Sequence, residues 1–184
     1  PALKLAKLIC NKTFAEKIFF TNSGAEAVEG AVKTARKYAS TNFSSKKNEI
    51  VAFNDAFHGR TMMAIALNGS KRMTEGFGPM PGGIKQHPFN QVDGLKKIIN
   101  KNTAAVVIEL IQGEAGIVPA KKVFINEIRK LCKKNNALIV IDEVQSGVGR
   151  TGHLYAYEKY NIKPDILCSA KGMGNGMPIG AILT

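Results

Sequence analysis

An acidic residue and a lysine stand at two places where a buried strand is expected to end. Asp142 follows the apolar run 137–141, Ala-Leu-Ile-Val-Ile, and Lys171 lies in Ser-Ala-Lys-Gly-Met-Gly, 29 residues further on (171 minus 142). A carboxylate can keep a pyridine nitrogen protonated, and a lysine amine can form a Schiff base with an aldehyde. Because these are the two contacts that pyridoxal 5'-phosphate needs, we interpret Asp142 and Lys171 as catalytic residues around that cofactor.

A phosphate site is expected in the run 21–27, Thr-Asn-Ser-Gly-Ala-Glu-Ala, at a junction between a strand and a helix. Small residues such as Ser23, Gly24 and Ala25 let an anion approach the unpaired amide groups and the positive dipole at the start of a helix. The alternative is a capping box in which Ser23 and Glu26 satisfy those amides themselves. The presence of Asp142 and Lys171 elsewhere in the chain favours the phosphate interpretation.

Two further segments are expected at the same edge of the sheet. In Phe57-His58-Gly59-Arg60, the aromatic ring can lie on a flat cofactor and the guanidinium can bind a carboxylate, although a core Phe and a surface Arg are common. We assign no role to His58. Asp142 is followed by Glu143, Val144 and Gln145, which are predicted to face the cofactor, although Glu143 also fits an ordinary acid in a turn after a strand.

The positions of these residues depend on strands that alternate with helices. We expect strands at 17–21, 49–53, 104–110, 137–141, 165–169 and from 179 on, helices at 25–40, 92–99, 123–135 and 155–160, and a long loop at 69–90. The strand cores are continuous apolar runs, which is typical of a parallel sheet covered on both faces. Residues 1–10 read as the middle of an amphipathic helix, and the last residues as a buried strand, so both ends are expected to be cut.

Composition excludes several classes of protein. The 184 residues are 45% hydrophobic and 22% charged, and no apolar stretch is long enough to cross a membrane. Three scattered cysteines suggest neither a disulfide framework nor a metal site, so we expect no metal and a cytoplasmic setting. The net charge of +12 raises the alternative of a basic nucleic-acid-binding module, but the lysines are dispersed as pairs, which favours solvated surface charge.

The motifs together resemble those of the class-III pyridoxal phosphate aminotransferases, most closely the acetylornithine aminotransferase group with its ornithine aminotransferase relatives. The strings that carry the resemblance are those quoted above, together with Gly-Phe-Gly-Pro at 76–79, Ile-Gln-Gly-Glu at 111–114 and Ser-Gly-Val-Gly-Arg-Thr-Gly at 146–152. They occur in the family's order and span nearly the whole chain. The resemblance implies a three-layer α/β sandwich with a mostly parallel sheet, the large cofactor-binding domain of the fold-type I enzymes. On this basis, residues 1–184 are expected to be part of that domain, without the family's N-terminal segment and small C-terminal domain.

The resemblance also implies roles for single residues. Lys171 would form the Schiff base, Asp142 would pair with the pyridine nitrogen and Gln145 with the phenolic oxygen. The remaining implied contacts are those of Gly24 and Ala25 with the phosphate, of Phe57 with the ring, of Arg60 with the substrate α-carboxylate, and of Glu114 with the substrate.

The implied activity moves the terminal amino group of N-acetylornithine to 2-oxoglutarate in arginine biosynthesis, in a protein that is a homodimer at full length and binds neither nucleic acid nor membrane. Ornithine, succinylornithine and succinyldiaminopimelate remain open as alternative substrates. The isolated 184 residues are expected to be inactive.

Overall fold

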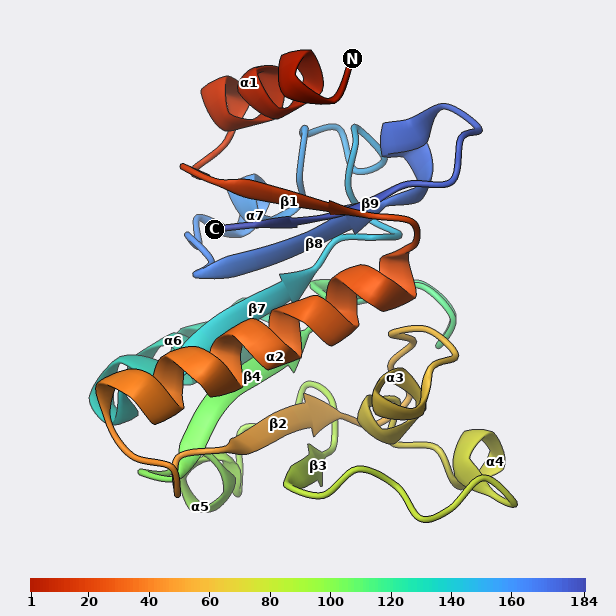
Figure 1. The fold of residues 1–184 in the computed structure, drawn as a ribbon. Coiled ribbons are helices and arrows are strands. Elements are labelled where there is room, and N and C mark those ends of the chain that lie inside the picture. Colours follow the sequence, from red (N-terminus) through yellow and green to blue (C-terminus); the bar gives the residue numbers. More distant parts are fainter.

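A seven-stranded sheet forms the centre of the molecule, in the computed structural model that describes residues 1–184 (Figure 1). The strand order is β1-β9-β8-β7-β4-β2-β3. Only β9 runs antiparallel to its neighbours, and the other pairs are parallel, which confirms the α/β class with a mostly parallel sheet. The strands are β1 (Ile18–Thr21), β2 (Glu49–Phe53), β3 (Ile84–His87), β4 (Thr103–Ile108), β7 (Leu138–Asp142), β8 (Ile166–Ala170) and β9 (Gly180–Leu183).

Helices cover both faces of the sheet. In Figure 1, α2 (Gly24–Asn42) crosses in front of the sheet and α6 (Lys122–Asn135) lies behind it, while α1 (Ala2–Lys12) packs at the β1 end. The shorter elements are α3 (Met62–Leu67), α4 (Lys71–Thr74), α5 (Leu95–Ile98), α7 (Tyr157–Tyr160), the 3-10 helix η1 (Lys171–Gly174), and a small ladder of β5 (Ile111–Gln112) with β6 (Val118–Pro119). None of the helices has the length and apolar character that a bilayer crossing requires.

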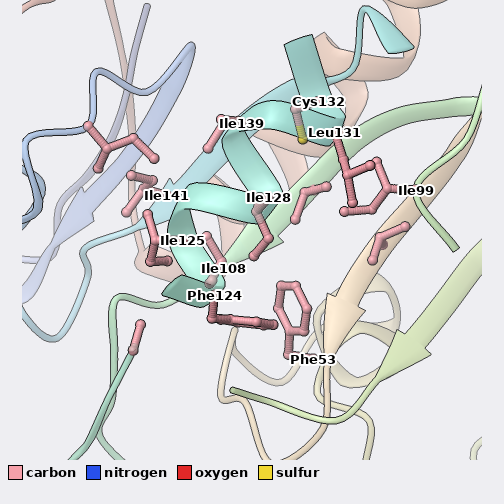
Figure 2. Close-up of a cluster of buried hydrophobic side chains, with 14 of the residues drawn as sticks. Phe53, Ile99, Ile108, Phe124, Ile125, Ile128, Leu131, Cys132, Ile139 and Ile141 are labelled. Carbon is pink, nitrogen blue, oxygen red and sulfur yellow. The ribbon is translucent and has the colours of Figure 1, made fainter. Parts of the chain in front are cut away.

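The side chains of the central strands alternate between two hydrophobic clusters, as the two-residue period of a strand requires. Val51 and Phe53 of β2 join the cluster under α6, whereas Ile50 and Ala52 join the cluster under α2. Figure 2 shows the first of these clusters, in which α6 lays its apolar face on β4 and β7. Because both faces are buried, the strands read as continuous apolar runs in the sequence.

Helix α2 lies close to the sheet because the residues of its inner face are small. Ala27, Ala31, Ala35 and Ala39 recur every four residues and are almost completely buried. This spacing places them along one face of the helix. The helix therefore holds a fixed position over the sheet, and its first turn lies on the side to which β7, β4 and β2 point in Figure 1.

The segment 69–90 is not the loop that the sequence suggested. It contains α4 and the edge strand β3, whose sequence Ile-Lys-Gln-His carries only one apolar residue because this strand is only partly buried. Helix α3 was also not predicted. The helix expected at 92–99 is reduced to α5, since Gly94 has a left-handed conformation (φ 92°) immediately before it.

Candidate active site

A cavity of about 290 Å³ opens where the parallel strands end and α2 begins. This is the edge at which open α/β sheets bind ligands. The structure brings to it all but two of the residues that the sequence singled out. The predicted residues that line it are Ser23, Gly24, Ala25, Phe57, Glu114, Asp142, Val144, Gln145 and Lys171.

The first turn of α2 presents amide groups to the cavity. The hydroxyl of Ser23 accepts a hydrogen bond from the amide of Glu26 (3.2 Å), and the Glu26 carboxylate accepts one from the amide of Asn22 (2.9 Å). The first intrahelical bond is donated by Ala27 to the carbonyl of Ser23. The amides of Gly24 and Ala25 precede that bond, so they have no partner within the helix and can bind an anion. The capping box therefore leaves these two amides available to an anion.

Two glycines allow the backbone segments of the site to approach one another. A Cβ atom on Gly24 would lie 2.7 Å from a methyl group of Val144, and one on Gly59 would lie 2.7 Å from the Cβ of Ala25. Gly59 also has a φ of 123°, which favours glycine. Both contacts hold the start of α2 against the other walls of the cavity.

The carboxylate of Asp142 is fixed by two hydrogen bonds. Its Oδ2 atom lies 2.8 Å from Nδ1 of His58, and its Oδ1 atom accepts a hydrogen bond from the amide of Val144 (3.0 Å). Burial alone would lower the pKa of His58, but the hydrogen bond and charge of Asp142, together with the charge of Glu109, raise it above its ordinary value. Nε2 of His58 is buried without a partner. Asp142 thus lies in a buried corner against the ring of His58, and this contact raises the pKa of His58.

Glu109 is a second buried carboxyl group in the cavity wall. It follows directly after β4 and accepts a hydrogen bond from the amide of Phe57 (2.9 Å). Burial raises the pKa of Glu109 to about 7, and the negative charge of Asp142 adds to the rise, while His58 and two backbone hydrogen bonds oppose it. Near neutral pH, this group can therefore change its charge.

Lys171 enters the cavity from the end of β8. It is the first residue of η1 and has a left-handed backbone conformation (φ 45°), so the chain turns sharply as the strand ends. Its ammonium group donates a hydrogen bond to the side-chain carbonyl of Gln145. The lysine amine and the Asp142 carboxylate therefore line one cavity, as expected.

Arg60 is one of the two predicted residues that do not line the cavity. Its guanidinium lies 5.6 Å from the centroid of the Phe57 ring and borders a separate surface hollow with Arg72 and Phe77. Phe57 itself lines the cavity, so the Phe57 ring lies next to both the cavity and Arg60.

Glu143 is the other exception, and it does not line the cavity. Its carboxylate accepts hydrogen bonds from the amides of Ala156 and Tyr157, each at 2.8 Å, and from the hydroxyl of Ser146 at 2.9 Å. Burial raises the pKa of Glu143, and these three bonds oppose the rise. Glu143 follows β7 directly, and these bonds anchor the loop 144–156.

Sequence reasoning missed His58 and Glu109. The sequence analysis assigns no role to His58, since a lone histidine carries little information. Glu109 had a usable signal: like Asp142, it is an acid that comes directly after an apolar strand, here the run 104–108. The rule that selects Asp142 applies to Glu109 only if the strand ends at Ile108, as it does in the structure, and not at residue 110, as the sequence analysis expects.

Comparison with known proteins gives relatives across the whole chain. A succinylornithine transaminase from Photorhabdus laumondii is 50% identical over 184 residues, covering 100% of this chain and 46% of that protein. An acetylornithine/succinyldiaminopimelate aminotransferase from Buchnera aphidicola is 52% identical with the same coverage. The chain thus spans about half the length of the curated relatives it matches.

Solved structures agree with this result. The ornithine aminotransferase of Toxoplasma gondii superimposes with a TM-score of 0.92 at 30% identity, over 98% of this chain and 44% of that one. The N-acetylornithine aminotransferase of Stenotrophomonas maltophilia gives a TM-score of 0.83 at 38% identity, over 100% of this chain and 45% of that one. The protein-family model that matches residues 1–184 is described as Aminotransferase class-III. The chain belongs to the class-III aminotransferases, a family of pyridoxal phosphate enzymes.

Proposed function

We propose that the full-length protein is a transaminase that moves the terminal amino group of N-acetylornithine to 2-oxoglutarate, a step of arginine biosynthesis. The observation that carries the proposal is the presence of Lys171 and Asp142 in one cavity, beside the free amides at the start of α2. The family and the relatives named above support the reaction class.

The residues of the cavity fit pyridoxal phosphate. Gly24 has no Cβ that would displace Val144, so the amides of Gly24 and Ala25 remain open to a phosphate. In the same cavity, Phe57 offers an aromatic face for the ring and Asp142 an oriented carboxylate for its nitrogen. Lys171 would hold the cofactor covalently, and Gln145, already in contact with that lysine, would bind the phenolic oxygen.

The cofactor, when bound, supplies an aldehyde that exchanges amino groups and a protonated ring that draws electrons from the substrate. The chain's own residues provide positioning and proton transfer. The Nζ atom of Lys171, when free, would act as the base that takes a proton from the amine-bearing carbon of the substrate. Asp142 would stabilise a positively charged ring nitrogen, and this electrostatic contribution would need no reorganisation because His58 and Val144 already orient the carboxylate.

Arg60 and Glu114 are proposed to contact the substrate. Glu114 lines the cavity and is exposed to solvent, so an incoming amine can reach it. The exposed guanidinium of Arg60 lies above the Phe57 ring and would bind a substrate carboxylate at the mouth of the site.

N-Succinylornithine is a second candidate substrate. It is favoured by the succinylornithine transaminases of Photorhabdus laumondii and Yersinia pestis, which are 50% and 52% identical to this chain. The acetyl and succinyl groups differ by one carboxylate, so a cationic contact beyond the amine-binding part of the cavity would distinguish them. We further propose that the full-length protein is a cytoplasmic homodimer and that residues 1–184 form part of its large domain.

The test is half-transamination of the cofactor-loaded, full-length protein. N-Acetylornithine, N-succinylornithine, ornithine and succinyldiaminopimelate are added separately, without a keto acid, and the visible absorbance of the bound cofactor is followed. We expect N-acetylornithine to abolish that absorbance at the lowest concentration, and 2-oxoglutarate to restore it. A preference for N-succinylornithine would select the second candidate, whereas a cofactor that no member of the panel converts would refute the proposed function.

A further inference from the structure

Three titratable side chains are buried together on one side of the cavity. His58, Glu109 and Asp142 are each at most 5% exposed. They come from different parts of the fold: His58 from the loop after β2, Glu109 from the end of β4 and Asp142 from the end of β7. The other charged side chains that line the cavity are Glu114 and Lys171, and both are exposed to solvent.

Each carboxylate of this cluster is held in place. Asp142 is bonded to His58 and to the amide of Val144. Glu109 accepts hydrogen bonds from the amides of Phe57 and Gly113, so it joins the two loops that carry Phe57 and Glu114. Glu109 forms no salt bridge, although it is buried. Burial therefore favours the neutral form of this group, and a nearby cation would favour the charged form.

The charges of the buried cluster do not balance by themselves. Its two carboxyl groups can carry two negative charges, whereas His58 can carry at most one positive charge, so at least one negative charge is uncompensated when both carboxylates are ionised. Glu109 is the group that responds to this imbalance. Its burial and the charge of Asp142 raise its pKa to about 7. A protonated ring nitrogen at Asp142 would be the missing cation, and with it two positive and two negative charges would cancel.

We propose that Glu109 is a positioning residue that supplies the second negative charge opposite His58 and the cofactor's ring nitrogen, and that cofactor binding drives a proton from Glu109 into solvent. The inference depends on the proposed function, because it requires the ring nitrogen to lie at Asp142. The balance is simple: the O–H bond of the Glu109 carboxyl breaks, its electron pair stays on the carboxylate, and the proton passes to the buffer.

The sign of the effect follows from the charge states. Below a pH of about 7, Glu109 is protonated in the cofactor-free protein and has a proton to release. Well above that pH it is already ionised, so its contribution disappears. The proton released by Glu109 on cofactor binding should therefore decrease as the pH rises through about 7.

The experiment is titration calorimetry of the cofactor-free, full-length protein with pyridoxal phosphate, in buffers of different ionisation enthalpy, at pH values on both sides of neutrality. The dependence of the binding enthalpy on the buffer gives the number of protons released. The cofactor contributes its own protons, so the informative quantity is the difference between the wild type and Glu109→Gln. Glu114→Gln, which removes an exposed carboxylate from the same cavity, is the matched control.

We expect Glu109→Gln to release up to about one proton fewer than the wild type below neutrality and the same number at high pH, whereas Glu114→Gln should behave as the wild type at both. Glu109→Asp should recover part of the release. His58→Gln keeps Glu109 but removes the neighbouring cation, so the pH at which the release is half complete should move upward. Equal proton counts in the wild type and Glu109→Gln would overturn the inference.

The two failures can be told apart. If the wild type takes up no pyridoxal phosphate, the proposed function fails, and the inference that depends on it fails as well. If the wild type binds the cofactor and neither Glu109→Gln nor His58→Gln alters the pH dependence of the proton count, only the inference fails. The His58→Gln result keeps the test decisive even if Glu109→Gln does not fold.

Discussion

At the scale of single residues, the cavity contains two buried carboxyl groups, Asp142 and Glu109, which differ in their hydrogen-bond partners. Asp142 has a histidine and an amide as partners, whereas Glu109 has amides alone and the charge of His58 at a distance. An acid whose pKa is higher in the folded than in the unfolded state destabilises the protein once it ionises. Glu109 should therefore contribute measurably to the pH dependence of the free energy of unfolding of the cofactor-free protein.

The prediction concerns Glu109→Gln. In the wild type, the stabilising contribution of protonated Glu109 is complete below its unfolded pKa near 4.5 and is lost as the pH rises through about 7. A pKa shift of this size corresponds to a contribution of Glu109 to the free energy of unfolding on the order of 3 kcal/mol. Denaturant unfolding at several pH values should show a flatter profile for Glu109→Gln across this range. The same slope in both proteins would show that Glu109 does not titrate as described, and Glu114→Gln is the control.

The sequence singles out Asp142 and Lys171 because each follows a strongly apolar strand and carries chemistry that a turn does not need, and the structure places both in the wall of one cavity. It could not identify the pairing of His58 with Asp142, which are 84 residues apart and meet only through the order of the strands. It also could not separate Glu143 from its neighbours, because the direction in which a side chain leaves the strand decides its role. Arg60 was assigned from its residue type, and the structure places it next to the cavity rather than in its wall.

At the scale of elements, the first turn of α2 and the loop after β7 form one unit. Gly24 lies against Val144 so closely that a Cβ atom would meet two of its methyl groups, at 2.7 and 2.9 Å. Val144 is β-branched and cannot easily turn away. The distance between α2 and this loop, and with it the direction of the free amides, is therefore set by the absence of a side chain at Gly24.

A pair of substitutions tests this contact. Gly24→Ala should displace the start of α2 and weaken pyridoxal phosphate binding by roughly tenfold, the effect of about 1.4 kcal/mol. Adding Val144→Ala should restore much of the affinity, because it removes the methyl groups that the new Cβ meets. Gly82→Ala, at a position where a Cβ atom meets nothing within 4 Å, is the control. Equilibrium binding of the cofactor gives the measurement; if the double variant binds no better than Gly24→Ala, the proposed contact does not govern the site.

Elements with strong apolar periods were predicted well, and those without them were not. Helices α2 and α6 and strands β2, β4, β7 and β8 lie close to the expected ranges, because each buries a continuous or regularly spaced set of side chains. Strand β3 escaped prediction because it is an edge strand with a polar sequence, and α3 because six residues give too little periodicity to recognise. Both contribute to the arrangement of the loop 54–61 that carries Phe57 and His58.

At the scale of the whole molecule, the order of the strands assembles the site. Strands β2, β4, β7 and β8 are successive neighbours in the sheet and run parallel to one another, so their carboxyl ends lie side by side. The residues that follow them, Phe57, Glu109, Asp142 and Lys171, consequently line one cavity although they span 115 positions (171 minus 57 plus 1). Helix α2 completes this cavity with its N-terminus.

The central claim is that Lys171 holds the cofactor in this cavity, and chemical mapping tests it most directly. The full-length protein is loaded with pyridoxal phosphate, reduced with borohydride to make the lysine linkage permanent, digested and analysed by mass spectrometry, with Lys171→Ala treated in parallel. We predict the cofactor adduct on the peptide that contains Lys171, and no specific adduct in the variant. An adduct on a different lysine, retained in Lys171→Ala, would contradict the account.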